Sequence, residues 1–173
     1  MVKDRNPAVL WKVLNELVRE NSEFEKYLEI KLVGKVDLFV KEQIQQFALT
    51  KYLKIIDYLP HSEVIIEQKK SKVLLLLVNN TKNAEGILTG KFYEYMSANV
   101  PVLAIGPVKG DLATQITETG VGLISGFEDE ISLKKNILDL FSGKVLTRSN
   151  EAVQSYSRKN LTGKLADLLN KLN

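Results

Sequence analysis

The feature that most constrains this chain is an uninterrupted apolar run from Val73 to Val78, with polar residues on both sides of it. The run is too short for a membrane span and has the length of one strand. Successive side chains of a strand point to opposite faces, so a strand that is apolar throughout must be covered on both faces. This pattern is typical of a strand inside a parallel sheet that carries helices on both sides.

Strand-like and helix-like segments alternate along the rest of the chain. Pro7 suits the first turn of an N-terminal helix that continues to about Glu20, with apolar residues at helical spacing. We predict further helices at residues 35–49, 61–70, 90–99, 111–119, 128–141 and 150–172, and strands at residues 30–33, 54–59, 73–78, 100–105 and 121–124.

This alternation, with right-handed crossovers, predicts a Rossmann-like α/β fold: a three-layer sandwich around a parallel β-sheet. We expect residues 1–173 to form a single domain, because no linker, repeat or low-complexity segment divides them. Ligands of such sheets bind beyond the carboxyl ends of the strands. The loops after Val33, Leu59, Val78 and Ile105 are therefore the candidate binding loops.

Composition excludes several classes of function. The chain has no cysteine and one histidine, His61, so disulfides, thiolate chemistry and a multi-histidine metal site are excluded, and we predict no metal. A formal net charge of +3 is too small to indicate a nucleic-acid partner. With no signal-peptide core and no apolar run of membrane-spanning length, we expect a cytoplasmic protein.

The most informative stretch follows the loop after the apolar run. Thr89 and Gly90 open a predicted helix, whose unpaired N–H groups and dipole suit a phosphate group. Lys91 and Glu94 share one flank of this helix, and its apolar residues face the core. A diphosphate can sit on the helix end and Lys91, while both oxygens of Glu94 accept from two ribose hydroxyls. The alternative is a capped surface helix with an ordinary Lys–Glu pair.

This stretch resembles the carboxyl-terminal domain of GT-B-fold glycosyltransferases of the family 4 (group 1) type. Residues 91–96 and 98–107 follow the family's order of a helix bearing a glutamate, small residues and a Pro-hydrophobic strand. The resemblance spans nearly the whole chain, and its weaker parts are residues 4–7, 33–34, 58–63, 120–122 and 156–161.

The resemblance implies the donor-binding domain of an enzyme that moves a sugar from a nucleoside-diphosphate sugar to an acceptor hydroxyl. It further implies retention of anomeric configuration, no metal or other cofactor, and a place in polysaccharide biosynthesis. Catalysis would then rest on electrostatic stabilisation of the departing diphosphate.

The resemblance also implies roles for individual residues. Glu94 matches the glutamate that holds the donor ribose, and residues 86–91, beginning at Gly86, match the loop and helix start that face the diphosphate and sugar. Arg5 falls where the family has a basic residue facing the phosphates. Tyr58 and His61 bound a loop that matches the one near the nucleobase.

Two departures from the family pattern matter. Gly86 stands where the first of the family's two glutamates is expected, and Glu85 is one residue out of register. The aligned chain also lacks the amino-terminal acceptor domain and the first strand of the present domain, which is central in the usual strand order. We expect the remaining strands to pair across the resulting gap, or another chain to fill it, as in a dimer formed through an exposed sheet edge. Alone, the chain should bind a nucleotide weakly and turn over nothing.

Other functions stay open at this stage. A sugar-nucleotide epimerase can share the fold but needs further acid/base residues, and the alternative without catalysis is a nucleotide-binding or docking module. The basic run at residues 69–72 is either a solvated helix end or a contact to acidic lipid. The latter would place the full enzyme at the inner face of the membrane.

Overall fold

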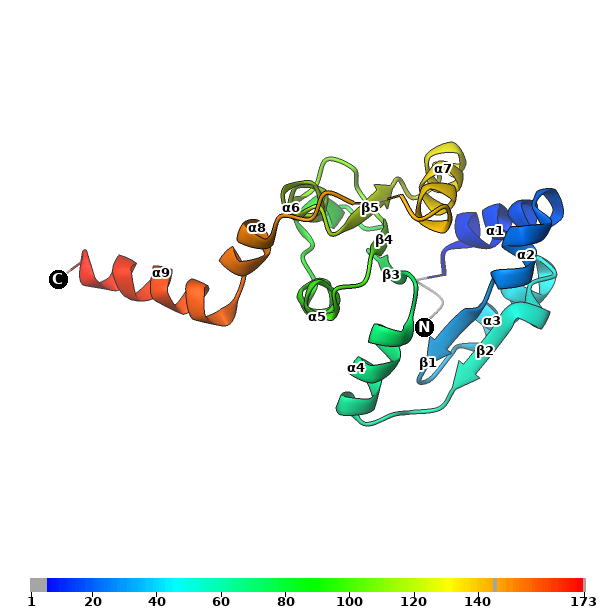
Figure 1. Ribbon diagram of the computed structural model, residues 1–173, viewed down its shortest axis with the longest axis horizontal. Helices are drawn as coiled ribbons and strands as arrows, with labels where there is room; N and C mark the ends of the chain where they lie inside the picture. Colours follow the sequence, from blue (N-terminus) through cyan, green and yellow to red (C-terminus); the bar gives the residue numbers. More distant parts are fainter. Residues whose placement is uncertain (1–5, 145, 173) are drawn as a thin grey trace.

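The computed structural model describes residues 6–144 and 146–172, in which strands and helices alternate along the chain (Figure 1). The elements, in chain order, are α1 (Ala8–Glu20), α2 (Ser22–Tyr27), β1 (Ile30–Val33), α3 (Leu38–Gln46), the 3-10 turn η2 (Thr50–Tyr52), β2 (Leu53–Ile56), α4 (His61–Lys70), β3 (Leu74–Leu77), the 3-10 turn η3 (Ala84–Gly86), α5 (Gly90–Ala98), β4 (Val102–Ile105), α6 (Asp111–Thr119), β5 (Gly122–Ser125), α7 (Glu130–Phe141), α8 (Asn150–Ser155) and α9 (Arg158–Asn170).

The strands of the described residues form two parallel sheets. β1 pairs with β2, and the second sheet has the order β3–β4–β5, with Leu74 opposite Val102 and Val102 opposite Gly122. The prediction of a Rossmann-like α/β architecture with parallel strands is confirmed. Of the two alternatives expected for the gap, pairing of the remaining strands across it is wrong, because β1 and β3 are not hydrogen-bonded neighbours, and filling by another chain stays a prediction.

One apolar cluster joins the two sheets on one face. Trp11 and Leu17 of α1 pack in it with Leu32 of β1 and with Leu103 and Ile105 of β4. Helices α3 and α7 contribute to the same cluster, so these helices cover both sheets at once. Since β1 and β3 do not pair, the two sheets are held together by this packing and by the connecting segments.

The opposite face of the second sheet carries another apolar cluster. Phe92 and Met96 of α5 and Leu112 of α6 pack there against Leu76 of β3 and Val102 of β4. β4 is buried along its whole length because helices lie on both of its faces. The buried α5 side chains match the face predicted from helical spacing.

The helix predicted at residues 35–49 is shorter in the structure, Leu38–Gln46, and two further helical features differ from the prediction. Helix α2 was not predicted. Asn21 follows the last residue of α1, and its side-chain oxygen accepts a hydrogen bond from the backbone N–H of Phe24 at 2.9 Å, which caps the start of α2. The predicted helix at residues 150–172 is divided into α8 and α9, because Ser157 leaves helical geometry and its hydroxyl accepts from the N–H of Asn160. Helix α9 extends away from the rest of the molecule (Figure 1) and buries none of its side chains.

Helix α4 is tied to β1 by Glu67, whose carboxylate accepts from the Nζ atoms of Lys31 and Lys70, both at 2.9 Å. These hydrogen bonds lower the pKa of Glu67 from 4.5 to about 2. Because the pKa of Glu67 is lower in the folded than in the unfolded chain, its ion pairs stabilise the folded state fully at pH values above the unfolded-state pKa. This stabilisation is lost as the pH falls towards the folded-state pKa.

We therefore expect Glu67→Gln to flatten the dependence of unfolding free energy on pH between about pH 5 and pH 2. At neutral pH the variant should be slightly less stable, because its neutral amide replaces a carboxylate paired with two ammonium groups. Urea titrations at a series of pH values measure both effects. Identical slopes for the two proteins in the acid range would contradict this assignment.

No helix within the described parts of the chain combines the length and the apolar character needed to cross a membrane.

Candidate functional site

The orientation of α5 is set by the burial of one of its faces. Phe92 is fully buried and Met96 is 3% exposed, so the helix is anchored against β3 and β4. Lys91 and Glu94 lie outside this face and are exposed. Neither side chain forms a hydrogen bond or ion pair with another described residue. A cation and a carboxylate are thus both accessible within the first turns of one helix.

The start of α5 borders open space. Thr89 is its N-cap residue, but the Thr89 side chain makes no capping hydrogen bond, and its Oγ1 is buried with no partner among the described residues. A Cβ added at Gly86 or Gly90 would meet no atom within 4 Å. The first N–H groups of the helix therefore lie where a ligand can approach the backbone, and the helix dipole favours an anion there.

The loop that leads into α5 is held from two sides. Ala84 is 6% exposed and packs in the cluster beside β3. Gly110, at the start of α6, lies so close to the loop that an added Cβ would come within 2.5 Å of the carbonyl oxygen of Glu85. The neighbouring Glu85 and Gly86 remain exposed. Packing thus supports the backbone of residues 84–86 while one of its surfaces stays accessible.

The other predicted site residues lie on different elements. Tyr58 is 86% exposed in the loop after β2, and His61 is exposed at the start of α4. No hydrogen bond joins either residue to residues 86–94 among the described contacts. Arg5 lies outside the described residues. The structure therefore brings together Gly86, Thr89, Gly90, Lys91 and Glu94 through one continuous segment.

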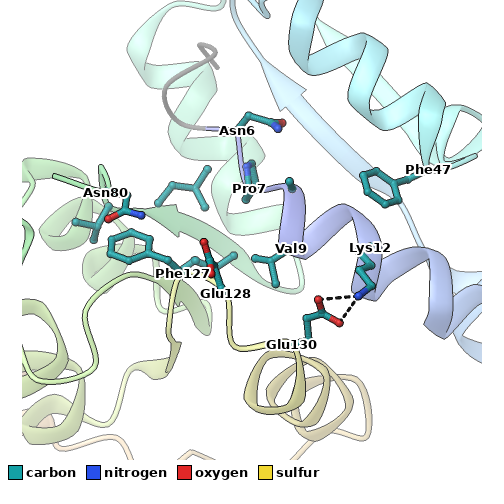
Figure 2. Close-up of a pocket in the computed structure, with 13 residues that line it drawn as sticks. Asn6, Pro7, Val9, Lys12, Phe47, Asn80, Phe127, Glu128 and Glu130 are labelled. Atoms are coloured by element: carbon teal, nitrogen blue, oxygen red, sulfur yellow. Dashed lines mark hydrogen bonds and ion pairs between the residues drawn. The ribbon is translucent and has the colours of Figure 1, made fainter.

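A cavity of about 520 Å³ lies elsewhere, at the carboxyl ends of β3 and β4 (Figure 2). The start of α1 forms one wall, and the segment leading into α7 forms another. Lys12 and Glu130 close one side of it through an ion pair, with Nζ 2.6 Å from Oε2. The lining residues are Asn6, Pro7, Ala8, Val9, Lys12, Phe47, Leu77, Val78, Asn80, Ile105, Phe127, Glu128 and Glu130.

None of the predicted donor-site residues within the described ranges lines this cavity. The general rule for parallel sheets does point to its location, since the loops after Val78 and Ile105 lead from it. Asn80, Phe127 and Glu128 were not predicted as site residues, because the cavity is assembled from segments that are far apart along the chain. In the described ranges, no three His, Asp or Glu side chains gather in a way that could hold a metal ion.

The parallel strands and their helical layers match the fold of the carboxyl-terminal half of a GT-B glycosyltransferase. The chain is similar in fold to the solved structure of sucrose-phosphate synthase from Thermosynechococcus elongatus. The two share a TM-score of 0.71 and 14% sequence identity over 99% of this chain and 43% of the synthase. The chain therefore spans less than half the length of that enzyme.

At this identity the likeness shows the fold alone. No family model matches the sequence, and no curated protein matches it.

Proposed function

We propose that this chain is the donor-binding domain of a glycosyltransferase, which transfers a sugar from a nucleoside-diphosphate sugar to an acceptor hydroxyl. The observation that carries the proposal is the start of α5, which borders open space and presents Lys91 and Glu94 to solvent. The GT-B fold of the chain supports it, because that fold is found in a glycosyltransferase. The resemblance to the family 4 type favours a retaining, metal-independent reaction.

In this proposal the diphosphate of the donor lies against the first N–H groups of α5 and the ammonium group of Lys91. Negative charge grows on the diphosphate as the bond to the sugar breaks. Fixed N–H dipoles and a cation stabilise that charge without having to reorient, which lowers the barrier. Arg5 is proposed as a second cation for the same group.

Glu94 is proposed to hold the donor rather than to react with it. A carboxylate has two acceptor oxygens and can take both hydroxyls of a ribose. Glu94 lies one helical turn beyond Gly90, so a nucleotide with its phosphates on the helix start can place its ribose alongside the helix. Tyr58 and His61 are proposed to approach the nucleobase.

Turnover also needs a region that holds the acceptor. The chain spans 43% of the synthase, and we propose that such a region belongs to the complete enzyme. A docking module without catalysis is the other candidate function.

We expect Glu94→Gln to weaken the binding of uridine or guanosine diphosphate by about 10- to 100-fold, measured by titration calorimetry. The estimate corresponds to about 1.5–3 kcal/mol for a hydrogen bond to a charged group. Glu42→Gln, which changes an exposed carboxylate on α3, is the matched control and should bind as the unchanged chain does.

Gly90→Ala tests the helix start separately. The added methyl group meets nothing in the folded chain, so the melting temperature should be unchanged or higher. The same methyl group would occupy the place of the phosphate and should weaken nucleotide binding by at least about tenfold, as expected when a charged contact of this strength is lost. If neither nucleotide binds, or if both variants bind normally, the docking module is favoured.

A further inference from the structure

The carboxyl-terminal end of α5 is held by a side chain from a distant part of the chain. Nη2 of Arg148 donates a hydrogen bond to the carbonyl oxygen of Met96 at 2.9 Å, and the two residues are 52 positions apart in the sequence. Met96 lies in the last turn of α5, where the final carbonyl groups of a helix have no partner within it. A cation at this end of a helix also interacts favourably with the helix dipole. Arg148 therefore caps α5 from outside the helix.

The end of α5 differs from the end of α6 in its backbone hydrogen bonds. The C-cap residue of α5, Asn99, has a left-handed conformation with φ of +58°, and within the described residues no hydrogen bond from its N–H to a carbonyl of α5 is found. Gly120 ends α6 in a similar conformation, but its N–H does donate to the carbonyl of Ile116. Arg148 thus supplies a contact that the backbone of α5 does not make for itself.

A second contact from the same segment reaches the middle of α5. The ring centroids of Tyr93 and Tyr156 lie 6.0 Å apart. Tyr93 directly precedes Glu94 in α5. Residues 148–156 therefore contact α5 on both sides of Glu94 along the helix, at Tyr93 and at Met96.

The segment of residues 148–156 is itself anchored on α6, beside which α8 lies (Figure 1). The N–H of Ser149 donates to the carbonyl of Thr119 at 2.9 Å, and the hydroxyl of Tyr156 donates to Oε2 of Glu118 at 3.0 Å. The other end of α6 approaches the loop that leads into α5. Helix α6 is therefore a common support for that loop and for the far end of α5.

The position of Glu94 depends on how firmly α5 is held. Phe92 and Met96 anchor one face of the helix, and Glu94 lies about half a turn from each of them, on the opposite side. Rotation or tilt of α5 on its buried face therefore displaces the Glu94 carboxylate. One nucleotide can contact both the helix start and Glu94 only if their separation is fixed, and a displacement of about 1 Å is enough to weaken such binding.

We propose that Arg148 is a positioning residue of the candidate donor site. Its guanidinium group holds the last turn of α5 through the carbonyl of Met96, and this contact sets the position of Glu94 relative to the start of the helix. Arg148 itself does not contact the donor. The inference rests on the proposed function, because it gives Arg148 a role in binding the donor ribose through Glu94.

The test begins with two substitutions at Arg148, each studied by calorimetric titration with uridine or guanosine diphosphate. Arg148→Met keeps an unbranched apolar side chain but cannot donate to the Met96 carbonyl, and it should weaken nucleotide binding by about tenfold. Arg148→Lys restores a cationic donor, so its affinity should lie within about threefold of that of the unchanged chain. Equal weakening by both substitutions, or by neither, would overturn the proposal.

A double-mutant cycle shows whether Arg148 acts through Glu94. In a chain that already carries Glu94→Gln, Arg148→Met should weaken binding by less than about threefold, because the contact that Arg148 positions has been removed. A loss of about tenfold in both backgrounds would mean that the two residues act independently, and the proposal would then be wrong.

Tyr52→Phe is the matched control for a general loss of stability. It removes one side-chain hydrogen bond beside the sheet of β1 and β2, that from the Tyr52 hydroxyl to Oε1 of Glu25 at 2.9 Å. This variant should bind the nucleotide as the unchanged chain does. A loss of affinity as large as that of Arg148→Met would assign the effect to stability and not to the position of α5.

Amide hydrogen exchange gives a readout that needs no nucleotide. In Arg148→Met the amides of residues 94–98 should exchange at least about tenfold faster than in the unchanged chain, while those of α6 change less. Unchanged exchange in α5 would contradict the role assigned to Arg148. If the unchanged chain binds neither nucleotide, the proposed function fails and this inference fails with it. If the unchanged chain and Arg148→Met bind equally well, only this inference fails.

Discussion

Trp11→Ala is expected to remove most of the stability of this fold. Trp11 is the largest fully buried side chain among the described residues, and its indole N–H donates to Oδ1 of Asn6 at 2.7 Å. Truncation of a buried aromatic residue costs about 3–5 kcal/mol, out of a typical total of about 5–15 kcal/mol. Trp11 also packs in the apolar cluster that joins the two sheets. The cavity left by its truncation should therefore weaken the contact between the sheets.

Urea denaturation followed by circular dichroism measures this loss. Fluorescence is unsuitable, since Trp11 is the one tryptophan of the sequence. Tyr27→Ala is the control, because Tyr27 is 64% exposed at the end of α2 and its truncation should cost less than about 1 kcal/mol. A comparable loss in both variants would show that Trp11 does not have the structural role assigned to it.

Gly120→Ala should be the other strongly destabilising substitution. Gly120 ends α6 in the left-handed conformation, with φ of +60°, and its N–H donates to the carbonyl of Ile116 at 2.9 Å. An added Cβ would come within 2.0 Å of the carbonyl oxygen of Thr147. The segment before α8 would have to move, although Ser149 holds it through a hydrogen bond to the carbonyl of Thr119. We expect the free energy of unfolding to fall by about 2–4 kcal/mol, the sum of the cost of the left-handed conformation for alanine and the cost of displacing the Thr147 carbonyl.

Gly143→Ala separates these two contributions. Gly143 also has a positive φ, of +75°, but a Cβ added there would meet nothing within 4 Å. Gly143→Ala should lower the free energy of unfolding only by the cost of the left-handed conformation for alanine, about 1 kcal/mol. The difference between the two melting curves measures the contact with Thr147. Equal losses would mean that the carbonyl moves away freely.

Helices and strands were largely predictable because their signals are local. The spacing of apolar residues placed α1, α5 and α6 within a residue or so of their observed bounds. Helix α2 and the division between α8 and α9 were not predicted, since both depend on a single capping side chain, Asn21 or Ser157. One polar residue at such a position competes with a helical pattern that otherwise looks continuous.

In the candidate site, only those residues that lie on one continuous segment could be predicted. The exposure of Lys91 and Glu94 follows from the burial of Phe92 and Met96, because all four lie on one helix. The position of the cavity beside the loops after Val78 and Ile105 was predictable from the general rule for parallel sheets, but its other walls were not. Its walls come from α1, from the ends of β3 and β4 and from the segment before α7.

The amino-acid sequence by itself determined the strand–helix alternation, the burial of Leu74 and Leu76 on one face of β3 with partial burial on the other, and the anchored face of α5, since each depends on the spacing of neighbouring residues. Only the tertiary structure decided that the described strands divide into two sheets and that one apolar cluster holds both. The physical reason is that backbone pairing depends on which strands lie next to each other in space. Residue spacing along the chain does not encode that arrangement.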